Sequence, residues 1–413
     1  MARTSTGTEI VAGVDLGSTT VSTVILEVDG AGGRSIVGVA SVPSGGGIRE
    51  GQVVSIERAT EAIRASVAEA ARMADCEITN VRLGIGGSDA LGINSDGTVA
   101  VRGGRVTPQD IERVLEAARA MPLPMEKQIL HALPQEFIVD GHDRIRSPVG
   151  MNGVRLETRV HVITAARTPL VNAIECCTKA GLTVDQVVFA GLASAAAVTT
   201  REERELGCAV VDVGGGTTDL TVWYDHALVH SVSWDWGGEE LTKQIARGLR
   251  TPVREAEGIK RQYGCALASL IADGETMAVQ SVGHREVQVR QRHVLCEIIE
   301  PMLEEMFARV DHELNVAGCR ELLAAGVVLT GGTAKLEAIA DLGEEILVGL
   351  PVRVGVPQGL RGLSEVVEDP TYATAAGLGL DTFDTVTEPV GPNRQTRSSG
   401  LWSRFRDAMD RWF

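Results

Sequence analysis

The chain has 413 residues and a formal net charge of −16, a length beyond the usual size of a single hydrophobic core, so two lobes are expected. The negative charge disfavours nucleic acid as a partner, and seven cysteines without a Cys-x-x-Cys pair disfavour a disulfide framework or a zinc site. No apolar segment is long enough for a transmembrane helix, and the polar start Met1–Glu9 lacks the apolar core of a secretory signal.

The first strong pattern is a strand, a polar turn and a second strand between Val11 and Val24. Its turn combines a carboxylate, a glycine and three hydroxyls: Asp15, Gly17, Ser18, Thr19 and Thr20. Small and hydroxyl-bearing residues bring donors close to a phosphate, and a carboxylate at a strand end can hold Mg²⁺ through water. The pattern predicts one half of a phosphate site, with a hairpin that binds nothing as the alternative.

From about residue 88 to residue 161 the pattern changes to a compact α+β unit. Two short apolar stretches flank an expected turn at Ser95–Gly97. Thr107 and Pro108 predict a helix start, with Thr as the N-cap, and the proline-rich segment 121–124 predicts its end. Because the unit begins and ends at predicted strands of the first lobe, it is expected to be an inserted subdomain.

The second lobe is predicted to open with another hairpin, which repeats the plan of the first. Its turn contains Asp212, Gly214, Gly215, Gly216, Thr217 and Thr218. Two such hairpins facing each other would hold a polyphosphate and Mg²⁺ between Asp15 and Asp212. Neither turn is followed by Gly-Lys-Ser/Thr, so a P-loop fold is disfavoured.

Two later segments supply candidates for contacts with a nucleoside. Glu257 and Lys260 lie three apart on a predicted helix and form either a solvated ion pair or a ribose contact. Gly331, Gly332 and Thr333 follow a predicted buried strand, where bare backbone can lie against a flat base.

The two hairpins and the glycine turn at Gly331 and Gly332, in this order and spacing, resemble the actin-like ATPase superfamily. The resemblance implies an α/β, actin-like (ribonuclease H-like) two-lobed ATPase fold with an inserted α+β subdomain and a C-terminal amphipathic helix. Within the superfamily, the chain resembles the FtsA family of cell-division proteins over about residues 8–381. The segments that carry this resemblance are Leu130–Asp140, Pro148–Leu156, Val160–Thr164, Gln186–Ser194, Glu203–Gly207, Ala256–Ala266 and Gly326–Gly332.

The resemblance implies a division of the chain into subdomains. The expected ranges are 1–83 and 163–206 for the first lobe (subdomain 1A, completed by about 361–383), 84–162 for the inserted subdomain 1C, 207–235 and 305–360 for subdomain 2A of the second lobe, 236–304 for subdomain 2B, 384–399 for a flexible linker and 400–413 for a membrane-targeting helix.

The resemblance also implies a role. The chain is expected to bind ATP or ADP with Mg²⁺, to polymerise at the division site on the cytoplasmic face of the inner membrane, and to anchor filaments of the tubulin-like protein FtsZ there. Later division proteins would bind residues 84–162. Subdomain 2B would bind the C-terminal peptide of FtsZ, with Arg285, Arg290 and Arg292 either as its basic contacts or as an ordinary charged surface.

Hydrolysis is expected to be slow or conditional. Heat-shock chaperones carry a glutamate in the segment that connects the lobes, whereas the matching stretch here, Ala190–Ala195, has no Asp, Glu, Gln or His. Turnover needs a positioned base or water as well as charge stabilisation. We therefore assign no catalytic residue and expect at most a weak ATPase.

The chain end is expected to bind a membrane. Residues 384–399 are rich in Thr, Pro, Ser and Asn, which predicts a flexible linker. After it, large apolar side chains recur at helical spacing: Leu401, Trp402, Phe405, Met409, Trp412 and Phe413. Such a helix can lie in an anionic headgroup region, or dock on the protein itself or on a partner. A soluble kinase or regulatory ATPase of the same superfamily is the alternative, and it gives the helix no membrane role.

Overall fold

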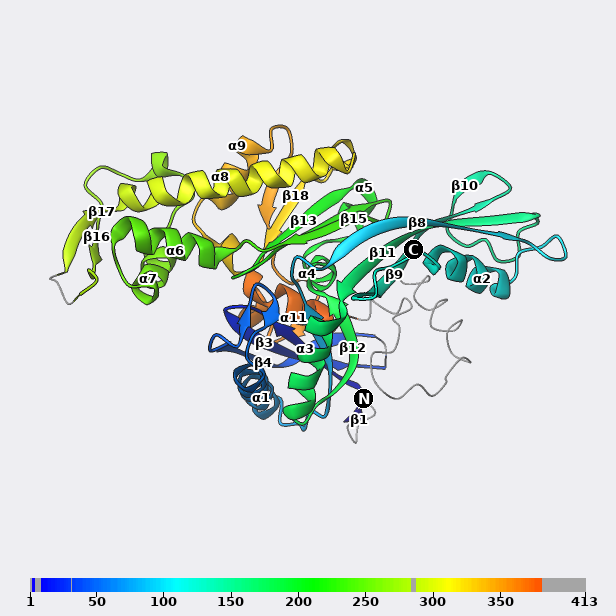
Figure 1. The fold of residues 1–413 in the computed structure, drawn as a ribbon, viewed down its shortest axis with the longest axis horizontal. Helices are drawn as coiled ribbons and strands as arrows, with labels where there is room; N and C mark the ends of the chain where they lie inside the picture. The colour runs from blue at the N-terminus through cyan, green and yellow to red at the C-terminus, as the bar shows by residue number, and fades with distance from the viewer. Residues whose placement is uncertain (1, 4–8, 31, 284–286, 381–413) are drawn as a thin grey trace.

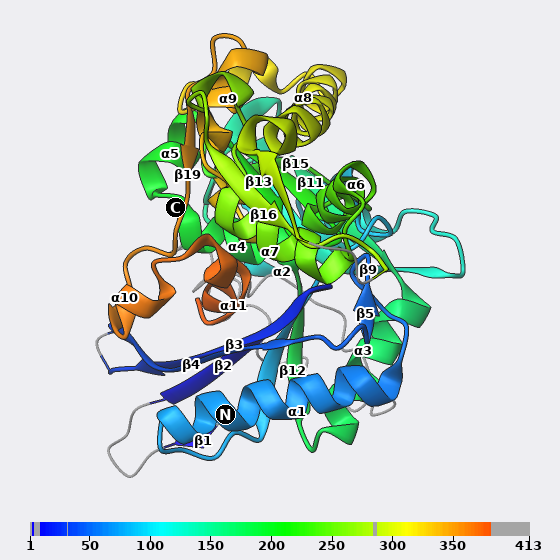
Figure 2. The same ribbon diagram turned by 90° about the vertical axis from the view of Figure 1, so that its left-hand side faces the viewer.

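The computed structural model describes residues 2–3, 9–30, 32–283 and 287–380 of the chain. These residues form two lobes, the first in the lower half of Figure 1 and the second in the upper half, and a third unit that projects to one side. Figure 2 shows the same arrangement after a quarter turn, with the strands of the first lobe lying between α1 and the second lobe.

The first lobe is built on a mixed sheet with the strand order β12-β7-β2-β3-β4-β20, and β1 pairs with β2. Its strands are β1 (Ala2–Arg3), β2 (Glu9–Leu16), β3 (Thr20–Val28), β4 (Arg34–Pro43), β7 (Asn80–Ile85), β12 (Thr183–Phe189) and β20 (Arg361–Gly362), and β5 (Ile48–Arg49) and β6 (Gln52–Val53) form a separate hairpin. Its helices are α1 (Ile56–Met73), α3 (Arg167–Lys179), α10 (Ser364–Val367) and α11 (Ala373–Leu378).

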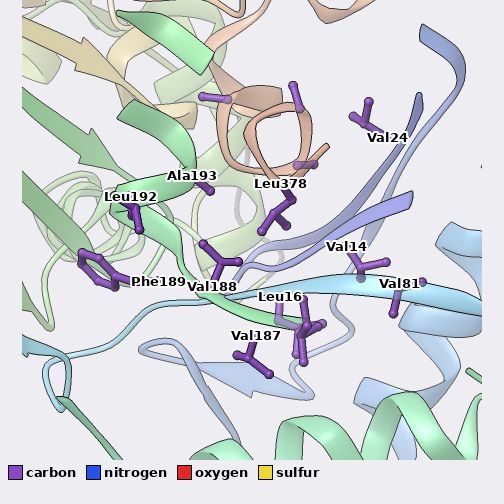
Figure 3. Close-up of a cluster of buried hydrophobic side chains, with 14 of the residues drawn as sticks. Val14, Leu16, Val24, Val81, Val187, Val188, Phe189, Leu192, Ala193 and Leu378 are labelled. Atoms are coloured by element: carbon purple, nitrogen blue, oxygen red, sulfur yellow. The ribbon is translucent and has the colours of Figure 1, made fainter. Parts of the chain in front are cut away.

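A continuous apolar core fixes the two helices that link the lobes. Helix α4 (Ala190–Val198) and helix α11 lie against the strands of the first lobe, and Figure 3 shows Leu192 and Leu378 in one cluster of buried side chains with Val14 and Val188. All four side chains are fully buried. Burial of a leucine or valine of this kind contributes roughly 1.5–3 kcal/mol. The core therefore holds β2, which carries Asp15, in a fixed relation to both linking helices.

The second lobe and the projecting unit share one nine-stranded sheet, in the order β10-β9-β11-β8-β15-β14-β13-β18-β19. The second lobe supplies β13 (Cys208–Val213), β14 (Thr218–Tyr224), β15 (Ala227–Trp234), β18 (Val327–Thr330) and β19 (Val352–Val354). Around it lie α5 (Arg201–Leu206), α6 (Gly238–Leu249), α7 (Val253–Tyr263), α8 (Arg292–Val316), α9 (Ile339–Ile346) and the hairpin of β16 (Thr276–Val279) and β17 (Gln288–Gln291).

The projecting unit is the predicted insertion, and one expectation about it is wrong. It comprises β8 (Leu91–Ala100), α2 (Pro108–Arg119), β9 (Lys127–Val139), β10 (His142–Ile145) and β11 (Arg155–Ala166). Helix α2 begins after Thr107 as predicted, with a capping box between Thr107 and Asp110. The turn expected at Ser95–Gly97 is absent, because β8 runs through it unbroken. A Cβ on Gly97 would lie 2.2 Å from Val114 O of α2, so the glycine permits close helix packing rather than a turn.

The predicted linker and membrane-targeting helix, residues 384–413, lie outside the described residues, as does Arg285. Within the part that the structure describes, none of the helices is both long and apolar enough to cross a membrane.

Candidate functional site

The two predicted phosphate turns, one from each lobe, lie in direct contact. A Cβ on Gly215 would stand 2.0 Å from Thr19 Oγ1, and one on Gly216 would stand 2.5 Å from Ser18 Oγ. Only bare backbone allows this approach. The structure therefore brings together the two halves of the predicted site, although they are about 200 residues apart in sequence.

Three carboxylates gather behind these turns: Asp212 and Asp219 are buried, and Asp15 is half-buried. Burial, followed by the charge of Asp212, raises the pKa of Asp15 to about 7. Burial also raises the pKa of Asp212 to about 6, against the opposing effect of hydrogen bonds from Ser194 and Thr374. The pKa of Asp219 lies well above its ordinary value, because of burial first and then the charges of Asp212 and Asp15. Without a nearby cation, nothing neutralises the negative charges of these three carboxylates when they are ionised.

Asp219 belongs to the same cluster of carboxylates, although the sequence motifs did not predict it. It pairs directly with Asp212 across β13 and β14, and its Oδ1 is buried without a hydrogen-bond partner in the described structure. The available signal was its position at the end of the second turn, where the register of a hairpin places it opposite Asp212. Buried polar atoms normally have partners, so this oxygen is suited to a water or a metal-bound ligand.

Asp212 is held in place by segments from the end of the described chain. Thr374 of α11 donates a hydrogen bond of 3.1 Å to Asp212 Oδ2. Gly331, with φ of +84°, approaches so closely that a Cβ there would lie 2.4 Å from Asp212 Oδ1. Nothing in the local pattern around Thr374 indicates this role, because the contact depends on how α11 packs between the lobes.

The second turn is anchored by the start of α6. Gly238 N donates to Gly214 O (3.0 Å) and Glu239 N donates to Gly215 O (2.8 Å). Thr218 Oγ1 donates to Trp236 O over 2.8 Å. The first two bonds occupy carbonyl oxygens of the turn, which would otherwise repel an anion, and the third ties the turn to the segment before α6.

The predicted nucleoside contacts converge on Gly238. Lys260 Nζ lies 2.8 Å from Gly238 O and 2.8 Å from Glu257 Oε2. Thr333 Oγ1 donates to Gly214 O over 3.0 Å, and a Cβ on Gly238 would lie 2.6 Å from that hydroxyl. Lys260 is buried and Glu257 is half-buried, so their ion pair is only partly exposed to solvent. Burial lowers the pKa of Lys260, and its attraction to Glu257 partly offsets that effect.

The two basic candidates that the structure describes lie in different surroundings. Arg292 donates to Tyr263 O (2.8 Å) and Glu275 Oε2 (2.9 Å) and also pairs with Glu337, so it joins three segments of the second lobe. Arg290 lies on the exposed strand β17, where it contacts Gln288. Arg290 is therefore the more accessible of the two for a peptide, and a peptide-binding role for either arginine stays a prediction.

Similarity to known proteins covers most of the chain. A family model described as cell division protein FtsA matches residues 209–377, another described as an SHS2 domain inserted in FTSA matches residues 87–164, and a third described as type IV pilus assembly protein PilM matches residues 147–267. The chain is 43% identical to the cell division protein FtsA of Pseudomonas aeruginosa over 370 residues, covering 90% of this chain and 88% of the relative. It is 37% identical to that of Escherichia coli strain K12 over 408 residues, covering 96% of each.

Solved structures share the fold at low sequence identity. The PilM–PilN type IV pilus biogenesis complex contains a chain with a TM-score of 0.64 and 19% identity, covering 89% of this chain and 97% of that one. MreB5 of Spiroplasma citri bound to ADP gives a TM-score of 0.52 and 14% identity, covering 89% and 94%. These likenesses confirm the predicted actin-like fold.

Proposed function

Since the chain belongs to the FtsA family of cell division proteins, we propose that it binds ATP with Mg²⁺ between its lobes and links FtsZ filaments to the cytoplasmic face of the cell membrane at the division site. One observation carries the nucleotide part of this proposal: the glycine turn at Gly215 and Gly216 meets Ser18 and Thr19 directly in front of the buried carboxylates.

Asp15 and Asp212 are suited to holding Mg²⁺ through water, because Asp212 is buried and Asp15 half-buried, the charge of Asp212 disfavours ionisation of Asp15, and no cationic side chain of the described residues is among the groups that shift either pKa. Mg²⁺ usually keeps several waters and takes one or two carboxylates together with phosphate oxygens. The metal would supply positive charge to the phosphates. The contacts of the second turn with α6 hold its backbone in place for the same phosphates.

The surroundings of the carboxylates favour a nucleotide that controls conformation over one that is turned over rapidly. The segment that lies against Asp219 is the start of α4, where a Cβ on Gly191 would stand 2.9 Å from Asp219 Cβ. Its side chains are Ala, Gly, Leu and Ser, none of which is a general base for water. We propose that occupancy biases the relative position of the lobes and thereby assembly into filaments.

The linking role requires three further surfaces. We propose that residues 236–304, with Arg290 exposed on β17, receive the carboxylate-ended peptide of FtsZ, and that residues 84–162 bind other division proteins and contribute to filament contacts. The apolar residues of 400–413 would enter the headgroup region of an anionic membrane. The alternative, a soluble kinase, is not favoured, because the curated relatives compared above are cell division proteins.

Co-sedimentation with anionic liposomes and Mg-ATP tests the linking role. We expect the intact chain to pellet with the vesicles and to carry FtsZ with it, whereas a chain ending at Ser399 stays in the supernatant. Neutral vesicles are the control for the charge requirement. Equal behaviour of the two chains on anionic vesicles would rule out the membrane role of residues 400–413.

Replacing Lys260 with methionine should weaken ATP binding about tenfold, since a charge-assisted hydrogen bond contributes roughly 1.5 kcal/mol. The measurement is titration of a fluorescent ATP analogue with Mg²⁺. Lys243→Met is the matched control, because Lys243 lies on the exposed side of α6 and pairs with Glu240. An unchanged affinity in Lys260→Met would remove Lys260 from the nucleoside contacts.

A further inference from the structure

The inserted subdomain interrupts the sequence of the first lobe, but it is also attached to the second lobe by one backbone bridge and several side-chain bonds. Strand β8 lies beside β15 of the second lobe, and Figure 1 shows the two running together at the junction. The links are a backbone bridge between Leu91 and Val232 and side-chain bonds from Asn94 Nδ2 to Val229 O (3.2 Å), from Gln135 Nε2 to Leu228 O (2.8 Å) and from Arg146 to Asp225.

A buried polar network fixes the register of this attachment. His161 Nδ1 lies 2.7 Å from Asn94 Oδ1, and His161 Nε2 lies 2.8 Å from Ser231 Oγ. Because an amide oxygen only accepts, the histidine donates from Nδ1 and accepts the serine hydroxyl at Nε2. Burial lowers the pKa of His161 to about 3, so the ring is neutral at physiological pH. A satisfied network of this kind favours one docking geometry over alternatives.

The attachment ends at a contact beside the nucleotide site. Ser88, in the loop that leads into β8, donates its backbone N–H to Asp235 Oδ1 (3.2 Å) and its hydroxyl to Asp235 Oδ2 (2.6 Å). Asp235 lies in the loop between β15 and α6. Hydrogen bonds to an ionised carboxylate are stronger than neutral ones.

Both partners of this contact adjoin residues that touch the second phosphate turn. Trp236, next to Asp235, accepts the hydroxyl of Thr218, and a Cβ on Gly237 would lie 2.6 Å from Gly215 O. On the other side, Gly86 lies two residues before Ser88, and a Cβ there would stand 3.3 Å from Asp219 Oδ2. The second turn therefore adjoins the Asp235 segment through the backbone at Gly237, and the Ser88 segment through the side chains of Thr217 and Asp219 next to Gly86.

We propose that the contact between Ser88 and Asp235 is a latch through which phosphate binding at the second turn sets how firmly the second lobe holds the inserted subdomain. The inference rests on the proposed nucleotide function and goes beyond it, since it assigns the path from the phosphates to the subdomain. With the latch closed, the subdomain moves with the second lobe. With the latch open, the glycines at 86 and 87 let it turn on the first lobe.

The base of the subdomain borders a small cavity, beside hydrogen bonds from Gln52 to Asp89 and from Phe189 N to His131 that join it to the first lobe. The cavity lies between the subdomain and the first lobe, lined by Gly51, Val53, Ile85, Ala166 and Leu170 among others. Gly87 has φ of +121°, a conformation that other residues rarely adopt. The residues that line the cavity lack packing contacts on that side.

Hydrogen–deuterium exchange of the full-length chain, with and without Mg-ATP, tests the latch. The variants are Asp235→Asn and Ser88→Ala, singly and together, with Asp273→Asn in an exposed turn of the second lobe as the matched control. In the wild type and the control, we expect Mg-ATP to slow exchange of the amides of residues 86–95 about five- to tenfold. In Asp235→Asn this protection should disappear, and exchange in the double variant should equal that in Asp235→Asn alone.

Affinity for Mg-ATP gives an independent readout, because coupling between two sites is reciprocal. If Mg-ATP tightens the latch, breaking it must weaken Mg-ATP binding by the same factor, about five- to tenfold. A wild type that binds Mg-ATP without protecting residues 86–95, or an Asp235→Asn variant that keeps the protection, would overturn the latch and leave the proposed nucleotide function standing. A wild type that does not bind Mg-ATP at all would overturn both.

Discussion

Asp15→Asn is expected to stabilise the nucleotide-free protein at pH 7.5 and to abolish its stabilisation by Mg-ATP. A carboxyl whose pKa rises from 3.8 to about 7 on folding carries a cost of roughly 4 kcal/mol once it ionises. An amide avoids this charge, so the free energy of unfolding should rise by roughly 2–3 kcal/mol. The same change removes the charge that would attract Mg²⁺. We therefore expect a large loss of Mg-ATP affinity together with the gain in stability of the nucleotide-free protein.

The pH dependence has a defined sign. Between pH 4 and 7 the folded state binds more protons than the unfolded state, because the folded pKa values of Asp15 and Asp212, about 7 and about 6, exceed the unfolded value of 3.8. The contribution of these two groups to stability is therefore greatest below pH 4 and falls as the pH rises through 6 and 7. The stability of the Asp15→Asn protein should therefore decrease less as the pH rises.

Urea unfolding at pH 5.5 and 7.5, with and without Mg-ATP, measures both effects. Asp143→Asn on the exposed strand β10 is the matched control and should change neither stability nor the response to Mg-ATP. A less stable nucleotide-free Asp15→Asn protein, or one that Mg-ATP still stabilises as it does the wild type, would contradict the assignment of Asp15 to the metal.

Local sequence patterns predicted the parts of the site that lie within one hairpin. The carboxylate, glycines and hydroxyls of each turn are close in sequence, and their chemistry can be inferred without knowing their neighbours. Thr374 and the partnering of Arg292 could not be predicted, since each depends on segments that meet only in the folded chain. Gly97 was misinterpreted for the same reason: a glycine after Ser-Asp favours a turn locally, whereas the backbone of α2 decides the outcome.

The docking of the inserted subdomain shows the limit of such patterns most clearly. Alternating residues identify β8 and β15 as strands, but nothing in the sequence of either segment predicts that they pair. In the structure a single backbone bridge, between Leu91 and Val232, joins them. The polar residues at their junction, Asn94 and His161, have no motif of their own. Their role emerges only from the common register of strands contributed by both parts of the chain.

Gly377→Ala should destabilise the protein by about 3 kcal/mol, although alanine is the better helix former. A Cβ at this position in α11 would lie 1.8 Å from Ala193 O of α4, a contact with backbone that no side-chain rotation relieves. Helix α11 cannot retreat, because on its other side a Cβ on Gly13 would already lie 2.4 Å from Ala375 O. The helix is held between α4 and β2 with no space for a methyl group.

The displacement should also reach the proposed nucleotide site, since Thr374 of α11 donates a hydrogen bond to Asp212. We therefore expect weaker stabilisation by Mg-ATP in Gly377→Ala, measured by urea unfolding. Gly258→Ala in α7 is the matched control: it makes the same chemical change in a helix, with nothing within 4 Å of the new methyl group, and should stabilise the protein by about 1 kcal/mol. Opposite signs for the two variants would show that contact between the linking helices, rather than helix propensity, requires glycine at 377. A gain in stability from both would mean that α4 and α11 are not in backbone contact.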